Sequence, residues 1–196
     1  DMRAVGFKEF VDPEVLEVMD IPEVYASQGE IRIKNYASAV NPTDIVSRSG
    51  LIAQFRKDYP LPAVPGMDIS GIVDQVGEGV ETGVSIGDQV MGMVIPNALH
   101  GAYSEQITLN QFAVVKAPKG FSFVESATLP MNGLTARLSL DLLNLTKGQV
   151  VAVTGGPGAY GGYVIQLAKA DGLIVIADSN ESDIEPLREL GVDHII

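Results

Sequence analysis

Three glycines and one carboxylate near the end of the sequence have the spacing of a dinucleotide-binding turn. Gly156, Gly158 and Gly161 fit the pattern G-x-G-x-x-G, and Asp178 comes 22 residues after the first of them. In this pattern the first glycine allows a tight turn, the second lets backbone N–H groups approach a pyrophosphate, and the third lets a helix pack closely. An acid about 20 residues further on suits a ribose hydroxyl group. These residues predict a site for a nucleotide's phosphates.

The segments around the glycines predict the elements that such a turn needs. An apolar run, 150–154, precedes it, an amphipathic run, 163–169, follows it, and a second apolar run, 173–177, leads to Asp178. Apolar strands without polar alternation are typical of a parallel sheet that is buried on both faces. We expect Ala159 and Tyr160 at the start of the helix, where backbone N–H groups attract phosphate. A glycine turn that only packs is the alternative.

Composition excludes several classes of function. The 196 residues are 46% hydrophobic, and their net charge of −12 argues against binding to the phosphate backbone of nucleic acids. The absence of cysteine rules out disulfides, thiolate zinc sites and a cysteine nucleophile. We found no apolar stretch long enough for a signal peptide or a membrane span. We therefore expect a cytoplasmic protein with neither nucleic acid nor membrane as a partner.

The pattern of elements changes near residue 120. Before it, short alternating segments separated by glycine turns predict a partly closed antiparallel barrel or sandwich. After it, helical spacing over 132–143 places Leu134, Leu138 and Leu142 on one face, and 192–196 starts a third strand. The fold class is therefore α/β. Because a doubly wound sheet needs about six strands, we expect an N-terminal portion of a longer polypeptide.

Several short motifs occur together in a characteristic order. They are Asn41-Pro42-Thr43-Asp44, Pro65-Gly66-Met67-Asp68, Gly87-Asp88-Gln89-Val90, Gly101-Ala102-Tyr103-Ser104-Glu105, Leu129-Pro130-Met131-Asn132-Gly133-Leu134-Thr135-Ala136, and the glycine turn. Over essentially its whole length the chain resembles the medium-chain dehydrogenase/reductase superfamily. The resemblance implies a GroES-like β-barrel catalytic domain over 1–120 and the first part of a Rossmann nucleotide-binding domain over 121–196. It also implies a homodimer in the full-length form.

Within that superfamily the chain resembles the zinc-independent, zeta-crystallin-like quinone oxidoreductase branch. Zinc-dependent members carry a cysteine where this chain has Asn41, and a histidine–glutamate pair where it has Met67 and Asp68. Catalytic zinc needs about three protein ligands of N, S or O type, and these three residues are not a credible set. His100 and His194 lie far from the motifs and are interpreted as ordinary surface or packing residues. No metal is expected.

The resemblance implies reduction of an acceptor that is already electrophilic. Without a metal as Lewis acid, hydride can still pass from a nicotinamide to a quinone or an α,β-unsaturated carbonyl, because conjugation spreads the incoming charge. The protein then supplies orientation and a dry pocket, and no essential acid–base side chain is expected. An enoyl-thioester reductase is an alternative, as is a non-catalytic nucleotide-binding sensor or interaction protein, or a fragment without the nicotinamide half-site.

The resemblance also places individual residues near the reaction. Asn41 and Asp44 would lie near the active site, with Asn41 bonded to the nicotinamide amide or the substrate carbonyl; helix capping is the alternative for Asn41. Met67 would line an apolar cleft, or belong to the core. Thr135 would lie near the cofactor, or be only a helix residue. The branch often has a tyrosine where this chain has Val46, which leaves the preferred acceptor open.

The choice between NADP(H) and NAD(H) rests on conflicting observations. Asp178 and the residues after it offer no cation to a 2′-phosphate, and a carboxylate about 4 Å from a phosphate is repelled by roughly 4 kcal/mol at intermediate dielectric. Local residues therefore favour NAD(H). The resemblance favours NADP(H), with Ser179 or Asn180 bonded to the phosphate and Asp178 turned away, and we expect NADP(H).

Overall fold

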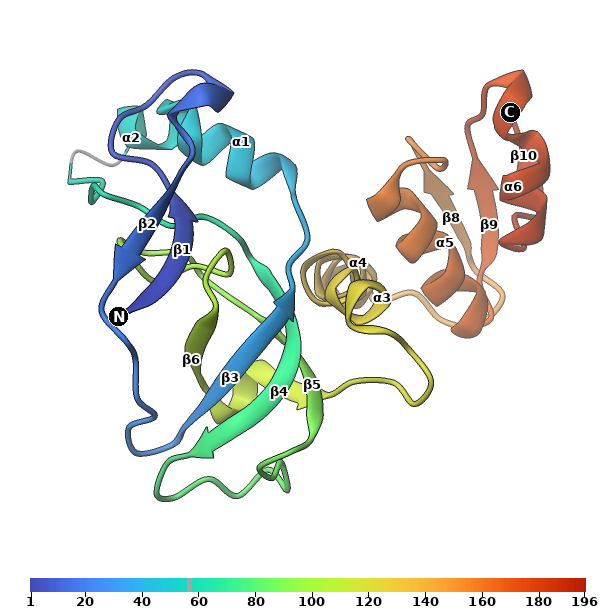
Figure 1. Cartoon of the computed structure of the whole chain (residues 1–196). Helices are drawn as coiled ribbons and strands as arrows, with labels where there is room; N and C mark the ends of the chain where they lie inside the picture. Colours follow the sequence, from blue (N-terminus) through green and yellow to red (C-terminus); the bar gives the residue numbers. More distant parts are fainter. Residues whose placement is uncertain (56–57) are drawn as a thin grey trace. The chain divides into compact units, whose positions relative to one another are not determined.

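The structure is a computed structural model that describes residues 1–55 and 58–196 (Figure 1). Its internal contacts divide the chain into two units, Asp1–Pro130 and Met131–Ile196. Helix α3 (Phe123–Ala127) packs against strands of the first unit, although it follows residue 120. The predicted domain limits, 1–120 and 121–196, stay a prediction for the whole protein.

The first unit is built on antiparallel strands. Its strands are β1 (Met2–Gly6), β2 (Glu17–Ile21), β3 (Glu30–Ala37), β4 (Asp68–Val76), β5 (Gln89–Met93), β6 (Gln106–Asn110) and β7 (Val114–Lys116). Five of them form one sheet in the order β6-β3-β4-β5-β7, and β1 pairs with β2. Alternating burial along β3 sends Ile31 and Ile33 into a core that they share with Ile69 and Val90. The predicted antiparallel β architecture is confirmed.

Short helices connect these strands. They are η1 (Pro13–Val15), α1 (Pro42–Arg48), α2 (Leu51–Phe55) and η2 (Gln111–Ala113), besides α3. Helix α1 begins where the Asn41-Pro42 pair predicts, because proline suits the first helical position. It ends before Gly50, whose φ of +82° suits glycine. Helix α2 directly follows and was not predicted.

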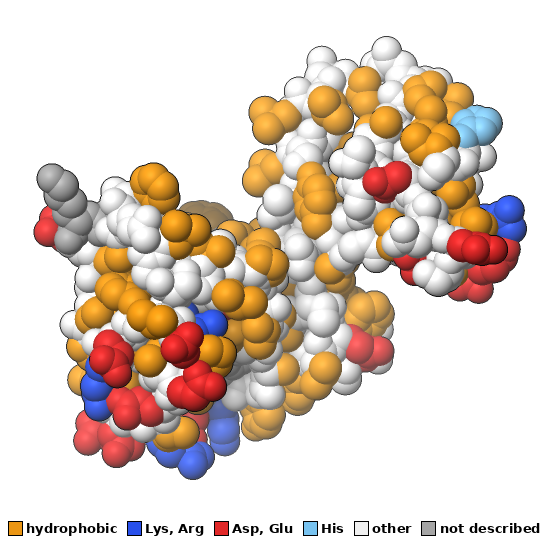
Figure 2. Space-filling view, turned by 90° about the horizontal axis from the view of Figure 1, so that it is seen from above, with side chains coloured by type: hydrophobic (Ala, Val, Ile, Leu, Met, Phe, Trp, Pro, Cys, Tyr) orange, Lys and Arg blue, Asp and Glu red, His pale blue; other side chains and the backbone are white. Residues whose placement is uncertain are grey.

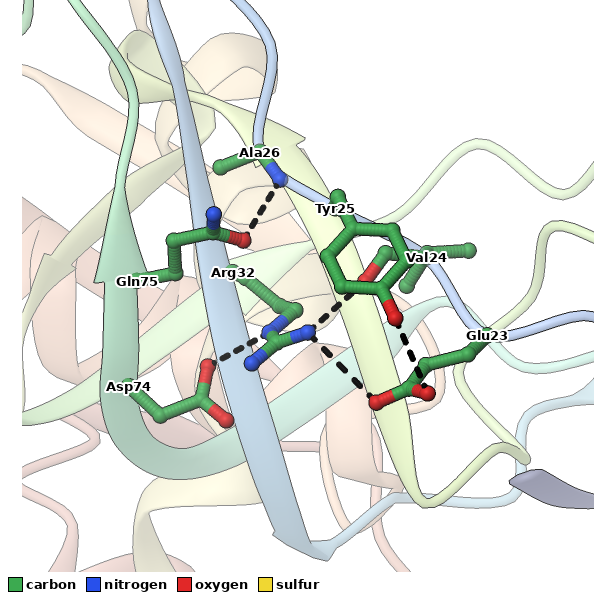
Figure 3. A network of polar contacts seen from close by, with 7 residues as sticks. All are labelled: Glu23, Val24, Tyr25, Ala26, Arg32, Asp74 and Gln75. Carbon is green, nitrogen blue, oxygen red and sulfur yellow. Dashed lines mark hydrogen bonds and ion pairs between the residues drawn. The ribbon is translucent and has the colours of Figure 1, made fainter. Parts of the chain in front are cut away.

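Arg32 ties the segment after β2 to the main sheet (Figure 3). From β3, its Nε donates to Asp74 Oδ1 at 2.9 Å and its Nη1 donates to the Val24 carbonyl at 3.0 Å. The Glu23 carboxylate lies 3.8 Å from Nη1, and the Tyr25 ring centroid lies 5.3 Å from the guanidinium carbon. Because all these partners meet one planar cation, the segment is held against β3 and β4.

The second unit is a small parallel sheet with helices. Its elements are α4 (Pro130–Leu143), β8 (Val150–Val153), α5 (Ala159–Ala170), β9 (Ile174–Ala177), η3 (Glu181–Asp183), α6 (Ile184–Glu189) and β10 (His194–Ile195). The strand order is β10-β9-β8, with parallel pairing. Val151 and Val153 meet Ile165 and Ala168 of α5 and Leu187 of α6 in one core. This is the predicted strand–turn–helix–strand unit of a Rossmann-like sheet.

The expectation of strands buried on both faces is wrong for β8. Val151 and Val153 are buried, but Val150 is 52% exposed and Ala152 is exposed. Burial therefore alternates along β8, so one side of the strand is buried and the other is exposed.

The apolar face of α4 also lies outside the core. Leu134, Leu138 and Leu142 are all exposed, and Leu142 is 86% exposed. The helix instead buries Ala136 and Leu140. Leucine spacing therefore identified the helix but not the side that faces the core.

The surface agrees with the acidic composition. On the face shown in Figure 2, acidic side chains are more prominent than basic ones, and apolar side chains are spread over both units. None of the helices in the described part of the chain has the length and apolar character that a membrane span requires.

Candidate functional site

The start of α1 is held by two residues of the predicted catalytic set. Asn41 precedes the helix, and its backbone N–H donates to Asp44 Oδ2 at 2.8 Å. In return, the Asp44 backbone N–H donates to the Asn41 carbonyl at 2.9 Å. Asn41 is 2% exposed and Asp44 is 6% exposed. Asn41 and Asp44 thus form a capping box at the start of α1, which agrees with the capping alternative for Asn41.

The loop before β4 is bonded to the same helix start. The Gly66 N–H donates to Asp44 Oδ1 at 2.9 Å, and Asn41 Nδ2 donates to Asp68 Oδ2 at 2.6 Å. Met67, which is half-buried, lies between these two anchored residues in the chain, and its carbonyl accepts the Val94 N–H at 2.8 Å. The structure therefore brings Asn41 and Asp44 together and fixes the backbone on both sides of Met67.

Tyr103 completes this buried cluster. Its hydroxyl donates to Asp44 Oδ2 at 3.1 Å, and its ring lies where a side chain at Gly66 would have to go, 2.5 Å from an ideal Cβ. Burial raises the pKa of the Tyr103 hydroxyl, and the charge of Asp44, its hydrogen bond to Asp44 and the charge of Asp68 raise it further. The hydroxyl stays protonated and serves as a donor.

Sequence reasoning missed Asp68 and Tyr103 as members of this site. Asp68 was considered only as a failed zinc ligand, and Tyr103 only as part of a motif. The signal in the sequence was their place in the Pro65–Asp68 and Gly101–Glu105 motifs, but only the fold shows that both carry partners of α1. Asp68 is 1% exposed, and a carboxylate so deeply buried needs such partners.

The predicted phosphate-binding turn lies between parallel strand β8 and helix α5. Gly155, with φ +69°, makes the tight turn that the sequence analysis assigned to Gly156. Gly156 is instead limited by packing, since an ideal Cβ would lie 3.0 Å from Ala177 Cβ. Gly158 is the N-cap residue of α5, and its N–H donates to the Gly155 carbonyl at 2.9 Å.

Gly161 brings the helix close to the turn. A Cβ at this position would lie 2.3 Å from the Gly155 carbonyl oxygen and 2.9 Å from Gly156 Cα. Such distances exclude any side chain without movement of the backbone. Gly161 therefore allows the close packing of the helix that the pattern predicts for its third glycine.

Asp178 directly follows β9 and faces this turn. Its Oδ1 accepts the Gly156 N–H at 3.1 Å, and the residue is half-buried. Ser179 is held beside it, with its N–H donating to the Ile196 carbonyl at 3.1 Å and its hydroxyl donating to the Asn180 carbonyl at 2.7 Å. Asp178, which the sequence analysis assigns to a ribose hydroxyl group, is thus in direct contact with the glycine turn.

Tyr160, in the first turn of α5, connects the turn to α4. Its hydroxyl donates to Ser139 Oγ at 2.7 Å, and that hydroxyl donates to the Thr135 carbonyl at 2.9 Å. The Thr135 side chain is exposed and donates to the Met131 carbonyl at 2.6 Å. The structure therefore gathers Thr135, Tyr160, the glycines and Asp178 within the second unit.

The predicted cofactor residues have the features of a phosphate site. Gly158, Ala159 and Tyr160 are exposed at the start of a 12-residue helix, where N–H groups and the helix dipole favour an anion. The two histidines belong neither to the buried cluster around Asp44 nor to the glycine turn. Burial lowers the pKa of the half-buried His100 imidazole. His194 is exposed on β10. Among residues 1–55 and 58–196, no group of three or more metal-ligating side chains is placed to hold a metal.

A comparison with protein families identifies the first unit. Residues 27–135 match the family described as the alcohol dehydrogenase GroES-like domain. The chain belongs to the medium-chain dehydrogenase/reductase superfamily. The strand order of the first unit and the parallel sheet of the second agree with this superfamily's two domains.

Individual superfamily members resemble the chain over nearly all its length. It is 34% identical to 2-methylene-furan-3-one reductase of Solanum lycopersicum and 31% identical to the chloroplastic NADPH-dependent alkenal/one oxidoreductase of Arabidopsis thaliana. Both alignments cover 98% of this chain and 51% of the relative. The solved structure of the quinone oxidoreductase from Coxiella burnetii is 33% identical in sequence and superposes with a TM-score of 0.85. The match covers 100% of this chain and 62% of the Coxiella chain. The chain thus spans about half the length of the curated relatives it matches.

Proposed function

We propose that the whole protein is a zinc-independent reductase that transfers hydride from NADPH to a quinone or an α,β-unsaturated carbonyl compound. The observation that carries this proposal is the Asn41–Asp68 hydrogen bond. In the zinc-dependent members that the chain resembles, ligands stand at these positions. Here an amide and a carboxylate bond to each other, in a chain without cysteine. Such a pair suits a site that orients a conjugated acceptor and leaves its activation to conjugation.

The glycine turn supports a dinucleotide as cofactor. The residues at the start of α5 are exposed and their N–H groups suit a pyrophosphate, while Gly156 and Gly161 allow the turn to pack closely against β9 and α5. Thr135, Ala159, Tyr160, Asp178 and Ser179 complete the proposed cofactor set. A bound reduced nicotinamide would supply the hydride, while the protein binds, orients and excludes water.

NADPH is proposed in preference to NADH. The name of the Arabidopsis relative specifies NADPH. In this chain Asp178 Oδ1 is engaged by the Gly156 N–H, which is consistent with a carboxylate that turns toward the glycine turn and leaves room for a 2′-phosphate. NADH is the alternative, in which Asp178 accepts a ribose hydroxyl group.

Asn41, Asp44 and Met67 are proposed to lie on the acceptor side of the reaction. Asp44 is not proposed as a general base, because its two oxygens already accept three hydrogen bonds, from Asn41, Gly66 and Tyr103. Its proposed role is to hold the helix start and the loop together. Met67, half-buried between two anchored residues, would offer an apolar surface to the acceptor.

The proposal is tested by turnover of NADPH with different acceptors in the presence of a metal chelator. We expect oxidation of NADPH with a 2-alkenal or a 1,4-naphthoquinone, and little with a saturated aldehyde. Faster turnover with a crotonyl thioester would favour the enoyl-thioester alternative. Tight NADPH binding without turnover of any acceptor would favour the non-catalytic alternative and contradict the proposal. A homodimer, which the family resemblance implies, and a cytoplasmic location, which the sequence analysis expects, stay predictions.

A further inference from the structure

The hydrogen bond between Asn41 and Asp68 fixes the direction of the Asn41 amide. A carboxylate can only accept hydrogen bonds, so the amide nitrogen must face Asp68 and the amide oxygen must lie on the other side. Because the acceptor is a carboxylate, this bond of 2.6 Å is charge-assisted, and such bonds are roughly twice as strong as neutral ones. Both side chains are almost completely buried. Reversal of the amide would place its oxygen against a buried negative charge.

The surrounding contacts hold this pair in one place. Asp44, on α1, accepts the Gly66 N–H, and Asn41, before α1, donates to Asp68 at the start of β4. The helix start and the segment 66–68 are therefore joined by two parallel connections that involve both carboxylates. Tyr103 closes the cluster from the loop before β6. Neither partner of the amide–carboxylate pair can shift without disturbing a second buried hydrogen bond.

We propose that Asp68 is a positioning residue for hydride transfer: its carboxylate, bonded to Asn41 Nδ2, presents the Asn41 amide to the reaction in a single orientation. This inference rests on the function proposed above. The Asn41 side chain also accepts the Asp44 N–H in a capping box, so with one Nδ2 hydrogen bonded to Asp68 the second Nδ2 hydrogen remains as a defined donor to a nicotinamide carboxamide oxygen or an acceptor carbonyl. Groups fixed before the reaction stabilise developing charge without reorganising. Asp68 itself touches neither reactant.

The test exchanges donor and acceptor across the pair. In the double variant Asn41→Asp/Asp68→Asn, the buried hydrogen bond is restored in the opposite direction with the same total charge. Asp68→Asn alone keeps a hydrogen bond of nearly the same shape but permits either amide to turn over. Asp88→Asn is the matched control, because it removes one negative charge from the same unit outside the cluster. Unfolding midpoints, kcat and KM are measured for each in the whole protein.

The expected results separate orientation from stability. The double variant should unfold close to the wild type, whereas kcat/KM should fall about 10- to 100-fold, the size expected when a reacting group is misplaced. The kcat/KM of Asp68→Asn should fall about 3- to 10-fold, mostly through kcat. The kcat/KM of Asp88→Asn should stay within twofold of the wild-type value. If Asp68→Asn or a stable double variant turns over within twofold of the wild type, the inference is overturned. Should the double variant not fold, Asp68→Asn decides alone.

A second readout does not depend on turnover. In the wild type, the Asn41 side-chain amide should give one pair of proton signals, with the Nδ2 proton bonded to Asp68 shifted downfield. In Asp68→Asn that shift should fall or the signals should double. Identical spectra would overturn the inference even for an active enzyme. A wild-type protein that reduces no acceptor but shows the downfield signal would contradict the proposed function and leave the fixed amide established.

Discussion

Asp44 and Asp68 are buried carboxylates that accept hydrogen bonds from neutral donors at the start of α1 and in the neighbouring loops. Removing such charges from water is costly unless each oxygen is hydrogen-bonded. Asn41, Gly66 and Tyr103 meet that requirement at both oxygens of Asp44, and Asn41 Nδ2 meets it at one oxygen of Asp68. The same contacts fix the residues that the proposed function places beside the acceptor, so stability and geometry depend on the same few atoms.

Substitution of Tyr103 by Phe should test this cluster. At neutral pH the variant loses a donor to a buried carboxylate, and its free energy of unfolding should fall by about 1–3 kcal/mol. Because the folded-state pKa of Tyr103 is raised above 10.0, the unfolded state releases this proton first as the pH rises. The wild type should therefore lose stability above about pH 10 through this group, and the variant should not. Urea unfolding at pH 7 and pH 11 measures the difference in unfolding free energy between the two proteins, which should be smaller at pH 11. An unchanged difference would contradict the hydrogen bond from the Tyr103 hydroxyl to Asp44.

Substitution of Asp178 by Asn should test the cofactor preference. The variant keeps an acceptor for the Gly156 N–H but removes the charge that would repel a 2′-phosphate. We expect the Kd for NADPH to stay within threefold or to decrease, and the Kd for NADH to rise about tenfold. Fluorescence titration of both nucleotides is straightforward because the chain has no tryptophan. A parallel loss of affinity for both nucleotides would show that Asp178 binds the ribose in either case.

The turn between β8 and α5 depends on close contact of backbone with backbone. Gly161 and Gly162 are neighbours in the same helix but differ in the space around them. A Cβ at Gly161 meets the Gly155 carbonyl oxygen at 2.3 Å, whereas a Cβ at Gly162 meets nothing closer than Leu190 Cδ1 at 3.8 Å. The helix therefore excludes a side chain at position 161 and has room for one at position 162.

Gly161→Ala should accordingly displace the turn. We expect destabilisation by about 1–3 kcal/mol from overpacking and a loss of NADPH affinity of tenfold or more. Gly162→Ala is the matched control and should be neutral or stabilising by about 0.5–1 kcal/mol, because alanine favours helix. Thermal unfolding and nucleotide titration measure both effects. Equal behaviour of the two variants would be incompatible with this packing.

For helices and strands, the sequence predicted where the elements lie better than which of their sides face the core. The glycine pattern and Asn41-Pro42 located two helix starts because they act through local backbone geometry. The buried sides of α4 and β8 were not predictable, because Leu138 and Val150 are apolar in the sequence whether or not anything covers them. The Asn41–Asp68 contact joins residues 27 positions apart and depends on the register of β4, which no local pattern contains.

The whole chain consists of two units with separate cores. The cores of the first unit use residues from Met2 to Val114, and the core of the second uses residues from Ala136 to Leu187. The boundary after Pro130 was less predictable than the units themselves, because α3 resembles the helices that follow it in sequence but packs on the strands that precede it.

Core substitutions in the two units should act independently. Ile107→Ala should destabilise the first unit and Ile165→Ala the second, each by about 2–5 kcal/mol, since both side chains are fully or almost fully buried. Calorimetry should show that each substitution lowers one transition and leaves the other in place. If either variant lowered both transitions equally, the two cores would have to unfold as one.

Transfer of deuterium to a 2-alkenal from NADPH with both C4 hydrogens of the nicotinamide replaced by deuterium, in the presence of a chelator, tests the proposed reaction most directly. The account predicts a saturated aldehyde with one deuterium on the β-carbon, formed at the same rate with and without the chelator. A product without deuterium, deuterium on the carbonyl carbon, or activity that the chelator abolishes would contradict it.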